Sequence, residues 1–142
     1  MITREQLEAM ADAELDRVVA EVVMGWMVSR EYAHKAWSVP LESPLFRKWD
    51  GEYIEKGDGS GLNCPAFSRD ISAAWQVVAQ IDSLGFNWVI ENWMGKTLVR
   101  FSSRKPHPKD WSRFTAHTDG CAVARPICIA AVLAAQSAKE ST

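Results

Sequence analysis

The most electropositive stretch of the chain mixes cations with aromatic rings. Residues 96–118 carry six basic residues against one acid, a local balance of +5. The basic residues are Lys96, Arg100, Arg104, Lys105, Lys109 and Arg113. Trp111 and Phe114 stand among them, and His117 follows. Cations neutralise phosphates while aromatic faces stack on bases, so the segment predicts an anion-binding surface. The alternative is a solvated hairpin edge whose cations discourage strand aggregation.

A second candidate lies in the stretch "PAFSRDISAAWQVV", residues 65–78. It predicts a helix that Ser68 caps, with Arg69 in a first turn where the helix dipole disfavours positive charge. Backbone N–H groups at such a start can hold an anion, and Arg69 would add charge. Asp70 could instead neutralise both. Two interpretations stay open: Arg69 faces a ligand, or it pairs with Asp70.

These two segments define the expected ligand site. It combines the helix start of one chain with basic-loop residues of the same chain or of a neighbouring copy, and a tryptophan stacks on the ligand. The candidate residues are Ser68, Arg69, Arg104, Lys105, Arg113, Trp49, Trp111 and His117.

Motifs for metal binding and catalysis are weak. The spacings from His117 to Cys121 and from Cys121 to Cys128 match no common zinc site. The "GDGSG" run at 57–61 lacks the lysine and hydroxyl residue of a phosphate loop, and no nucleophile-elbow motif occurs. We therefore expect no metal, no cofactor and no enzymatic activity.

The elements that must position these residues follow from periodicity. Thr3 to Gln6 matches a capping box, and an apolar stripe then runs from Leu7 to Trp26 with Asp16 on its opposite, solvent-facing side. From Ile71 a second helix is expected to bury Ile71, Ala74, Trp75, Val78 and Ile81. The run "ICIAAVLAA" after Pro126 is apolar nearly all round and predicts a deeply buried last helix.

Between these helices the pattern favours strands. "FNWVIENW" at 86–93 alternates, and Met94-Gly95 can turn it into "KTLVRF" as a hairpin. Residues 111–118 are expected to form a third strand. Of the seven tryptophans, those in periodic segments are expected in the core. They are Trp26, Trp75, Trp88 and Trp93.

Length and composition set the frame. The 142 residues suit a single domain, 1–142, with residues 34–65 as a long irregular connection containing a short extended piece near Trp49. No apolar run is long enough for a membrane span, and the N-terminus has no signal-peptide pattern, so we expect a cytoplasmic protein with reduced cysteines. The net charge of −2 and a pI of about 5.9 argue against DNA or RNA as partner.

Four segments resemble the phage ABA sandwich domain family. They are "AELDRVVAEVVMGW" (13–26), "WDG" (49–51), "FSRDISAAWQVV" (67–78) and "ICIAAVLA" (127–134). The resemblance implies an α+β fold, a three-layer α/β/α sandwich with a small antiparallel sheet between helices. It also implies a phage or prophage origin. The chain departs from the family pattern at Phe67, Arg69 and Ile129, where tyrosine, threonine and arginine are usual. Phe67 lacks the phenolic hydroxyl and Ile129 lacks the buried cation, so a ligand role of those two groups does not carry over.

Together these features predict a non-enzymatic phage protein that sequesters a small anionic, nucleotide-type host signal made during antiviral defence. A homo-oligomer is expected, because two copies of a small chain can build a larger pocket. One alternative is an interaction module that inhibits a host factor or assists phage assembly, with Trp37 and Trp49 as anchors. The other is a small nucleotide hydrolase.

Overall fold

A computed structural model describes residues 1–25, 27–29, 48–49, 52–55, 61–62, 65–104, 113–120 and 122–140. Its helical elements are α1 (Arg4–Ala9), α2 (Asp12–Val18), the π-helical turn η1 (Val19–Val23), α4 (Ile71–Ser83) and α5 (Ala124–Glu140). The main sheet consists of β5 (Phe86–Trp93), β6 (Lys96–Ser103) and β7 (Arg113–Asp119). A second small sheet holds β1 (Met27–Ser29), β2 (Lys48–Trp49), β3 (Glu52–Glu55) and β4 (Gly61–Leu62). The predicted α+β class is confirmed.

The main sheet is antiparallel, with β6 in the centre. In the β5–β6 hairpin, Phe86 pairs with Ser103 and Trp93 pairs with Lys96, so the two-residue turn Met94-Gly95 closes it as predicted. Both turn residues have positive φ, 52° at Met94 and 76° at Gly95. Such a turn matches the twist of the flanking strands.

Alternation along β6 defines the two faces of this sheet. Thr97, Val99 and Phe101 are fully buried and point toward the helices. Against them lies α5, whose apolar middle is almost completely inaccessible, as its sequence predicts. The core therefore sits between the inner face of the sheet and helices α4 and α5.

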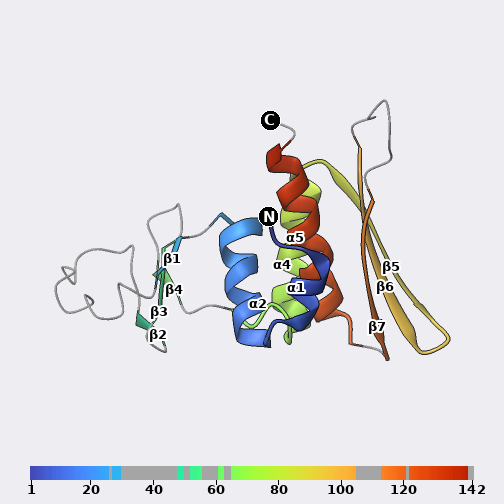
Figure 1. The fold of residues 1–142 in the computed structure, drawn as a ribbon, viewed down its shortest axis with the longest axis horizontal. Helices are drawn as coiled ribbons and strands as arrows, with labels where there is room; N and C mark the ends of the chain where they lie inside the picture. The colour runs from blue at the N-terminus through green and yellow to red at the C-terminus, as the bar shows by residue number, and fades with distance from the viewer. Residues whose placement is uncertain are drawn as a thin grey trace.

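The described helices lie on one side of the main sheet (Figure 1). The helix layer that the resemblance implies for the other face is not seen among the described residues. On β6, the residues of that face are Lys96, Leu98 and Arg100, a mixture of charged and apolar side chains that suits contact with solvent. None of the described helices is long and apolar enough to cross a membrane.

Three of the tryptophans expected in the core are exposed, so that prediction was wrong. Trp75 is 44% exposed, Trp88 41% and Trp93 74%. Ile71, at the start of α4, is 44% exposed as well. The apolar stripe of α4 is wider than the surface it covers: Ala74, Val78 and Ile81 reach the core, whereas Ile71 and Trp75 do not. The side chain of Trp26 lies outside the described residues.

Polar groups of the N-terminal helices form hydrogen bonds within α1 and to a distant segment of the chain. The capping box of α1 is present as predicted, with Thr3 and Gln6 bonding each other's backbone N–H groups. Asp16 on α2, expected toward solvent, is only 3% exposed. Asp16 is buried because its carboxylate accepts a hydrogen bond from a buried backbone donor of a distant segment, the N–H of Ser68.

Candidate functional site

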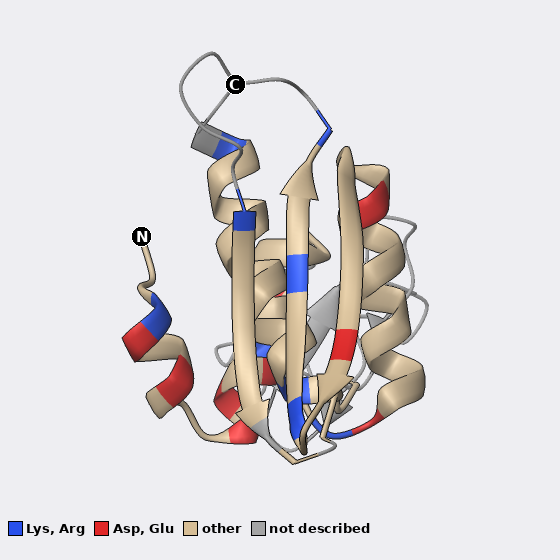
Figure 2. Cartoon of the chain, turned by 90° about the vertical axis from the view of Figure 1, so that its right-hand side faces the viewer, with Lys and Arg blue, Asp and Glu red and all other residues tan. Residues whose placement is uncertain are grey.

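The outer face of the main sheet, which none of the described helices covers (Figure 1), gathers cations and an aromatic ring. On β6 the outward residues are Lys96, Leu98 and Arg100, which alternate with the buried ones. The register places Thr115 of β7 beside Arg100 and His117 beside Leu98, and it places Arg113 opposite Ser102. Figure 2 looks onto the strands of this sheet and shows basic positions in blue along them. By register, Lys96 and Arg100 lie on β6 and Arg113 lies on the neighbouring strand, β7.

Among the side chains that the structure describes, the acidic one on this face, Glu91, lies near the hairpin turn. Glu91 of β5 pairs with Leu98, and Asp119 of β7 occupies the register position opposite Lys96. Arg100 and Arg113 lie further along the strands. In the part of the chain that the structure describes, neither guanidinium has an ion-pair partner. The end with Arg100 and Arg113 is therefore the place where an anion meets uncompensated charge.

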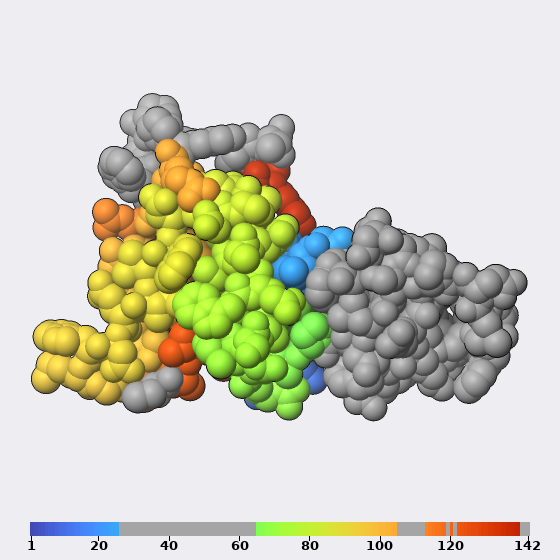
Figure 3. All heavy atoms as spheres, turned by 180° about the vertical axis from the view of Figure 1, so that it is seen from behind, coloured from blue at the N-terminus to red at the C-terminus, as the bar shows by residue number. Residues whose placement is uncertain are grey.

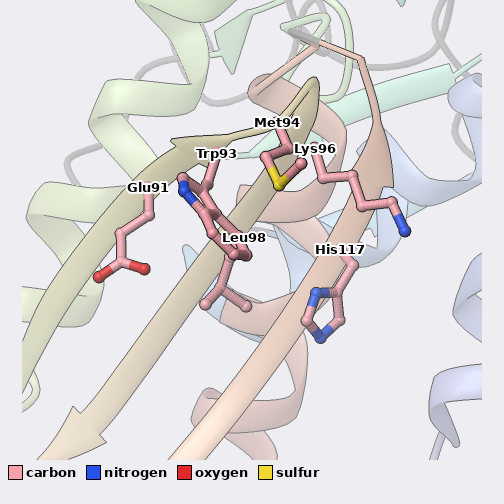
Figure 4. A pocket seen from close by; sticks show the side chains of 6 residues that line it. All are labelled: Glu91, Trp93, Met94, Lys96, Leu98 and His117. Carbon is pink, nitrogen blue, oxygen red and sulfur yellow. The ribbon is translucent and has the colours of Figure 1, made fainter.

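A pocket of about 440 Å³ opens at the hairpin end of the same face. Figure 4 shows the indole of Trp93 lying across β6 above Leu98, with His117 and Lys96 on the far side. Glu91 and Met94 complete the lining. An apolar floor with an indole wall and an imidazole suits a flat aromatic group.

The pocket beside Trp93 and the end of the face with Arg100 and Arg113 are close enough for one ligand to contact both. Leu98 and Arg100 are two residues apart on one strand, about 7 Å at the rise of an antiparallel strand. A ring held at Trp93 would therefore place a linked phosphate near Arg100. We call the surface formed by Trp93, Lys96, Leu98, Arg100, Arg113 and His117 the sheet-face site.

The helix start of α4 has a different role from the one expected. Asp70, not Ser68, is the N-cap, since its carboxylate accepts the N–H of Ser72 at 2.9 Å. Ser68 is 5% exposed, and its N–H donates to Oδ1 of Asp16 at 2.7 Å. The predicted Ser68 cap is wrong because this residue precedes the cap by two positions and joins α2 to α4 instead.

Arg69 pairs with Asp16 and not with Asp70. Its Nη2 lies 3.5 Å from Oδ2 of Asp16, whereas Asp70 is occupied as the cap. The Arg69 side chain is 56% exposed and the Asp16 side chain 4%. Arg69 thus compensates a buried carboxylate, although part of its guanidinium still faces solvent.

A second ion pair stands at the neighbouring helix start. Nη1 of Arg125 on α5 donates to Oδ1 of Asp12 at 2.7 Å, and Nη2 donates to the carbonyl of Met10 at 2.7 Å. Cys128 lies one turn further along α5 and is completely buried. Burial raises the pKa of its thiol far above the ordinary value, and the Asp16 carboxylate adds to the rise. This thiol is a neutral core group, not a nucleophile.

Arg104 lies at the other end of α4. Its Nη1 donates to Oδ1 of Asp82 at 2.8 Å and to Oδ1 of Asn87 at 3.3 Å. It also bonds the carbonyl of Asp82 in the last turn of the helix. A cation at a helix C-terminus is favoured by the dipole, so this arginine fastens α4 to the sheet.

The expected site residues therefore separate into three places in one chain. Ser68 and Arg69 lie at the start of α4, and Arg104 lies near its end, which 13 residues place about 20 Å away. Arg113 and His117 share the outer face of β7. Lys105 and Trp111, and the side chain of Trp49, lie outside the described residues.

Sequence reasoning missed three members of the sheet-face site. Lys96 and Arg100 belong to the basic segment but are not among the candidate ligand residues, and the sequence pattern predicts Trp93 in the core. Strict alternation with Thr97, Val99 and Phe101 could have shown that the two cations share the face opposite the core. Among the described residues, no three potential metal ligands come together.

Fold and site define a small α+β protein with an exposed, cationic sheet face. In a comparison with known families, residues 17–132 match the phage ABA sandwich domain. The chain belongs to this family, which confirms the resemblance seen in the sequence. Neither the curated proteins nor the solved structures give a match to this chain.

Proposed function

We propose that this phage-family protein is a non-enzymatic binding protein that captures a small aromatic anion of nucleotide type on the sheet-face site. One observation supports this proposal most: β6 carries Lys96 and the half-buried Arg100 on its outer face, and Trp93, which pairs with Lys96, is 74% exposed. Exposed apolar side chains that gather in one patch with polar neighbours mark binding sites, and Trp93 shares the pocket lining with Met94 and Leu98. The base would stack on Trp93 and the phosphate would bind Arg100 and Arg113.

Sequestration is the use that best fits such a surface. It needs affinity alone, so a protein of this kind requires no acid, base or nucleophile beside its ligand. A host nucleotide signal made during antiviral defence has the required chemistry, an aromatic base joined to phosphate. The ligand is therefore expected to be released unchanged after binding.

Calorimetry against a panel tests the proposal. The panel contains linear and cyclic nucleotides, the matching nucleosides and inorganic phosphate. We expect a nucleotide to bind at micromolar protein, while nucleoside and phosphate bind much more weakly because each uses half of the site. Chromatography of the bound nucleotide after incubation should recover it intact. Absence of heat for every nucleotide would overturn the proposal, and a cleaved product would favour a hydrolase.

A second function has its own supporting observation. Met94 is 81% exposed and adopts φ of 52°, an uncommon backbone conformation for a residue that is not glycine. With Trp93 it forms an exposed apolar tip on the hairpin, the kind of side chains that anchor protein interfaces. A stoichiometric host protein retained by the wild type and lost from Trp93→Ala would favour an interaction module.

A further inference from the structure

Strand β5 forms an open edge of the main sheet. In the described part of the chain it pairs with β6 alone, through eight consecutive residue pairs without a bulge. An edge of this length offers unpaired backbone groups to another strand.

The hairpin turn decides which backbone groups face outward. The two-residue turn makes Trp93 and Lys96 a hydrogen-bonded pair, and such pairs alternate along an antiparallel ladder. Backbone groups of Trp93, Glu91, Val89 and Asn87 therefore point toward β6. Those of Phe86, Trp88, Ile90 and Asn92 point to the open edge.

The composition of β5 gives this edge little protection. Sheet proteins commonly block an edge with charges, prolines or bulges. Glu91 is the one charged residue in β5, whereas the opposite edge strand, β7, carries Arg113, His117 and Asp119. Of the two edge strands, β5 is the one suited to pairing.

An aromatic pair lies beside the same edge on the helix side. The rings of Trp75 on α4 and Trp88 on β5 meet edge to face, with centroids 5.5 Å apart. Both side chains are more than 40% exposed. Figure 3 shows α4 and β5 side by side at the surface on this side of the molecule. The edge and this Trp75–Trp88 pair form one continuous surface.

We propose that β5 pairs with β5 of a second copy, antiparallel about a two-fold axis, so that the two main sheets join into one. Directly opposite residues of antiparallel strands share a face, so an axis through a residue keeps the helices of both copies on the same side. An axis at Val89 joins all four outward-facing residues, Trp88 with Ile90 and Phe86 with Asn92. The pairing is isologous and closes on itself.

Side-chain chemistry favours this register over its neighbours. With the axis at Val89, the Asn87 amide of one copy lies opposite the Glu91 carboxylate of the other and can donate to it. An axis at Ile90 would set Val89 against Glu91, and an axis at Glu91 would set two carboxylates together. In the chosen register the two Trp88 side chains are diagonal neighbours, about 7–8 Å apart. The Trp75–Trp88 pairs of both copies would then be shielded from water.

Sedimentation equilibrium tests the assembly. The wild-type chain is expected at twice its monomer mass at micromolar concentration, and Trp88→Lys is expected to weaken the dimer at least tenfold. Circular dichroism of the variant checks that it folds, since its side chain is exposed. A wild type that stays monomeric at every accessible concentration overturns the proposal.

Cysteine cross-linking tests the register. Val89→Cys faces its own copy across the axis, so mild oxidation should give a disulfide-linked dimer on a non-reducing gel. Asn87→Cys, which faces Glu91, and Thr115→Cys, on the outer face of β7, should cross-link no more than the wild type. A dimer in which Val89→Cys fails to cross-link contradicts this interface. Nucleotide binding plays no part in either experiment, so the outcome is independent of the proposed function.

Discussion

Asp16 connects α2 to the segment that precedes α4 from one buried position. Its carboxylate accepts the N–H of Ser68 and faces the guanidinium of Arg69, 52 residues or more away in sequence. A buried charge of this kind persists only when its partners remain in place. The helical pattern placed Asp16 on the solvent side because periodicity reports neighbours on one helix and not a polar contact made by a distant loop.

Replacement of Asp16 by alanine should therefore be costly. Asp16→Ala leaves the Ser68 N–H buried without an acceptor, and we expect the free energy of unfolding to fall by about 2–3 kcal/mol. Urea denaturation measures it. Glu14→Ala removes an exposed acid from the same helix and should change stability by less than about 0.5 kcal/mol. Equal losses in the two variants would contradict the assigned role of Asp16.

Cys128 adds a pH dependence to stability. Its folded-state pKa is raised by burial, so the folded chain keeps the thiol proton when the unfolded chain has lost it. The stability that the protonated thiol contributes is complete below the thiol pKa in the unfolded chain, about 8.5, and is lost as the pH rises further. Each pH unit above that value should lower the free energy of unfolding by about 1.4 kcal/mol.

The matched variant for this effect is Cys128→Ala. Urea denaturation gives the free energy of unfolding of both proteins over the same pH series. The difference between the two proteins at each pH cancels the effect of the other titrating groups. The wild type should lose stability faster than the variant above about pH 8.5. Parallel curves would contradict a protonated buried thiol.

At the scale of elements, the hairpin is the best-predicted feature and also holds the most unusual residue. Alternation in "FNWVIENW" and the Met94-Gly95 pair predicted both strands and the turn that the structure shows. Yet the first turn position, where φ is 52°, usually holds asparagine, aspartate or glycine. A methionine there indicates that the exposed side chain is kept for contact at some cost in backbone energy.

Met94→Asn should relieve that cost. Asparagine tolerates the left-handed conformation better than methionine, so we expect the free energy of unfolding to rise by about 0.5–1 kcal/mol. Met94→Ala keeps the unfavourable backbone and serves as the control, with no comparable gain. Thermal or urea denaturation distinguishes the two. A destabilised Met94→Asn would show that the Met94 side chain stabilises the fold itself.

For the helices, the apolar pattern predicts that each helix forms but does not always predict which of its residues other elements bury. The predicted stripe of α4 contains five apolar residues, and nothing in it shows that the core ends before Ile71 and Trp75. The run in α5 has no polar side at all, so the prediction of deep burial had no alternative and is confirmed. Burial was predictable where the apolar surface surrounds the helix, and ambiguous where it covers only part of it.

At the scale of the whole molecule, class and family followed from the sequence, whereas the positions of the candidate site residues relative to one another did not. The expected residues lie at three places because α4 separates Arg69 from Arg104 by its full length. The sheet-face site instead depends on strand register, which puts Arg113 and His117 of β7 on the same face as Lys96 and Arg100 of β6. A ligand can reach the sheet-face site because the described helices all lie on the other face of the sheet (Figure 1).

The most direct measurement of the central claim is calorimetric titration of Arg100→Ala and Arg4→Ala with the nucleotide that binds the wild type best. Each variant removes one arginine, but Arg4 lies on α1, away from the sheet face. A charge-assisted contact to phosphate is worth about 1.5–3 kcal/mol, so Arg100→Ala should raise the Kd about tenfold or more. Arg4→Ala should leave the Kd within about twofold of the wild type, since a distant surface charge is screened by salt. Equal affinity of the two variants would contradict the assignment of the ligand to this face.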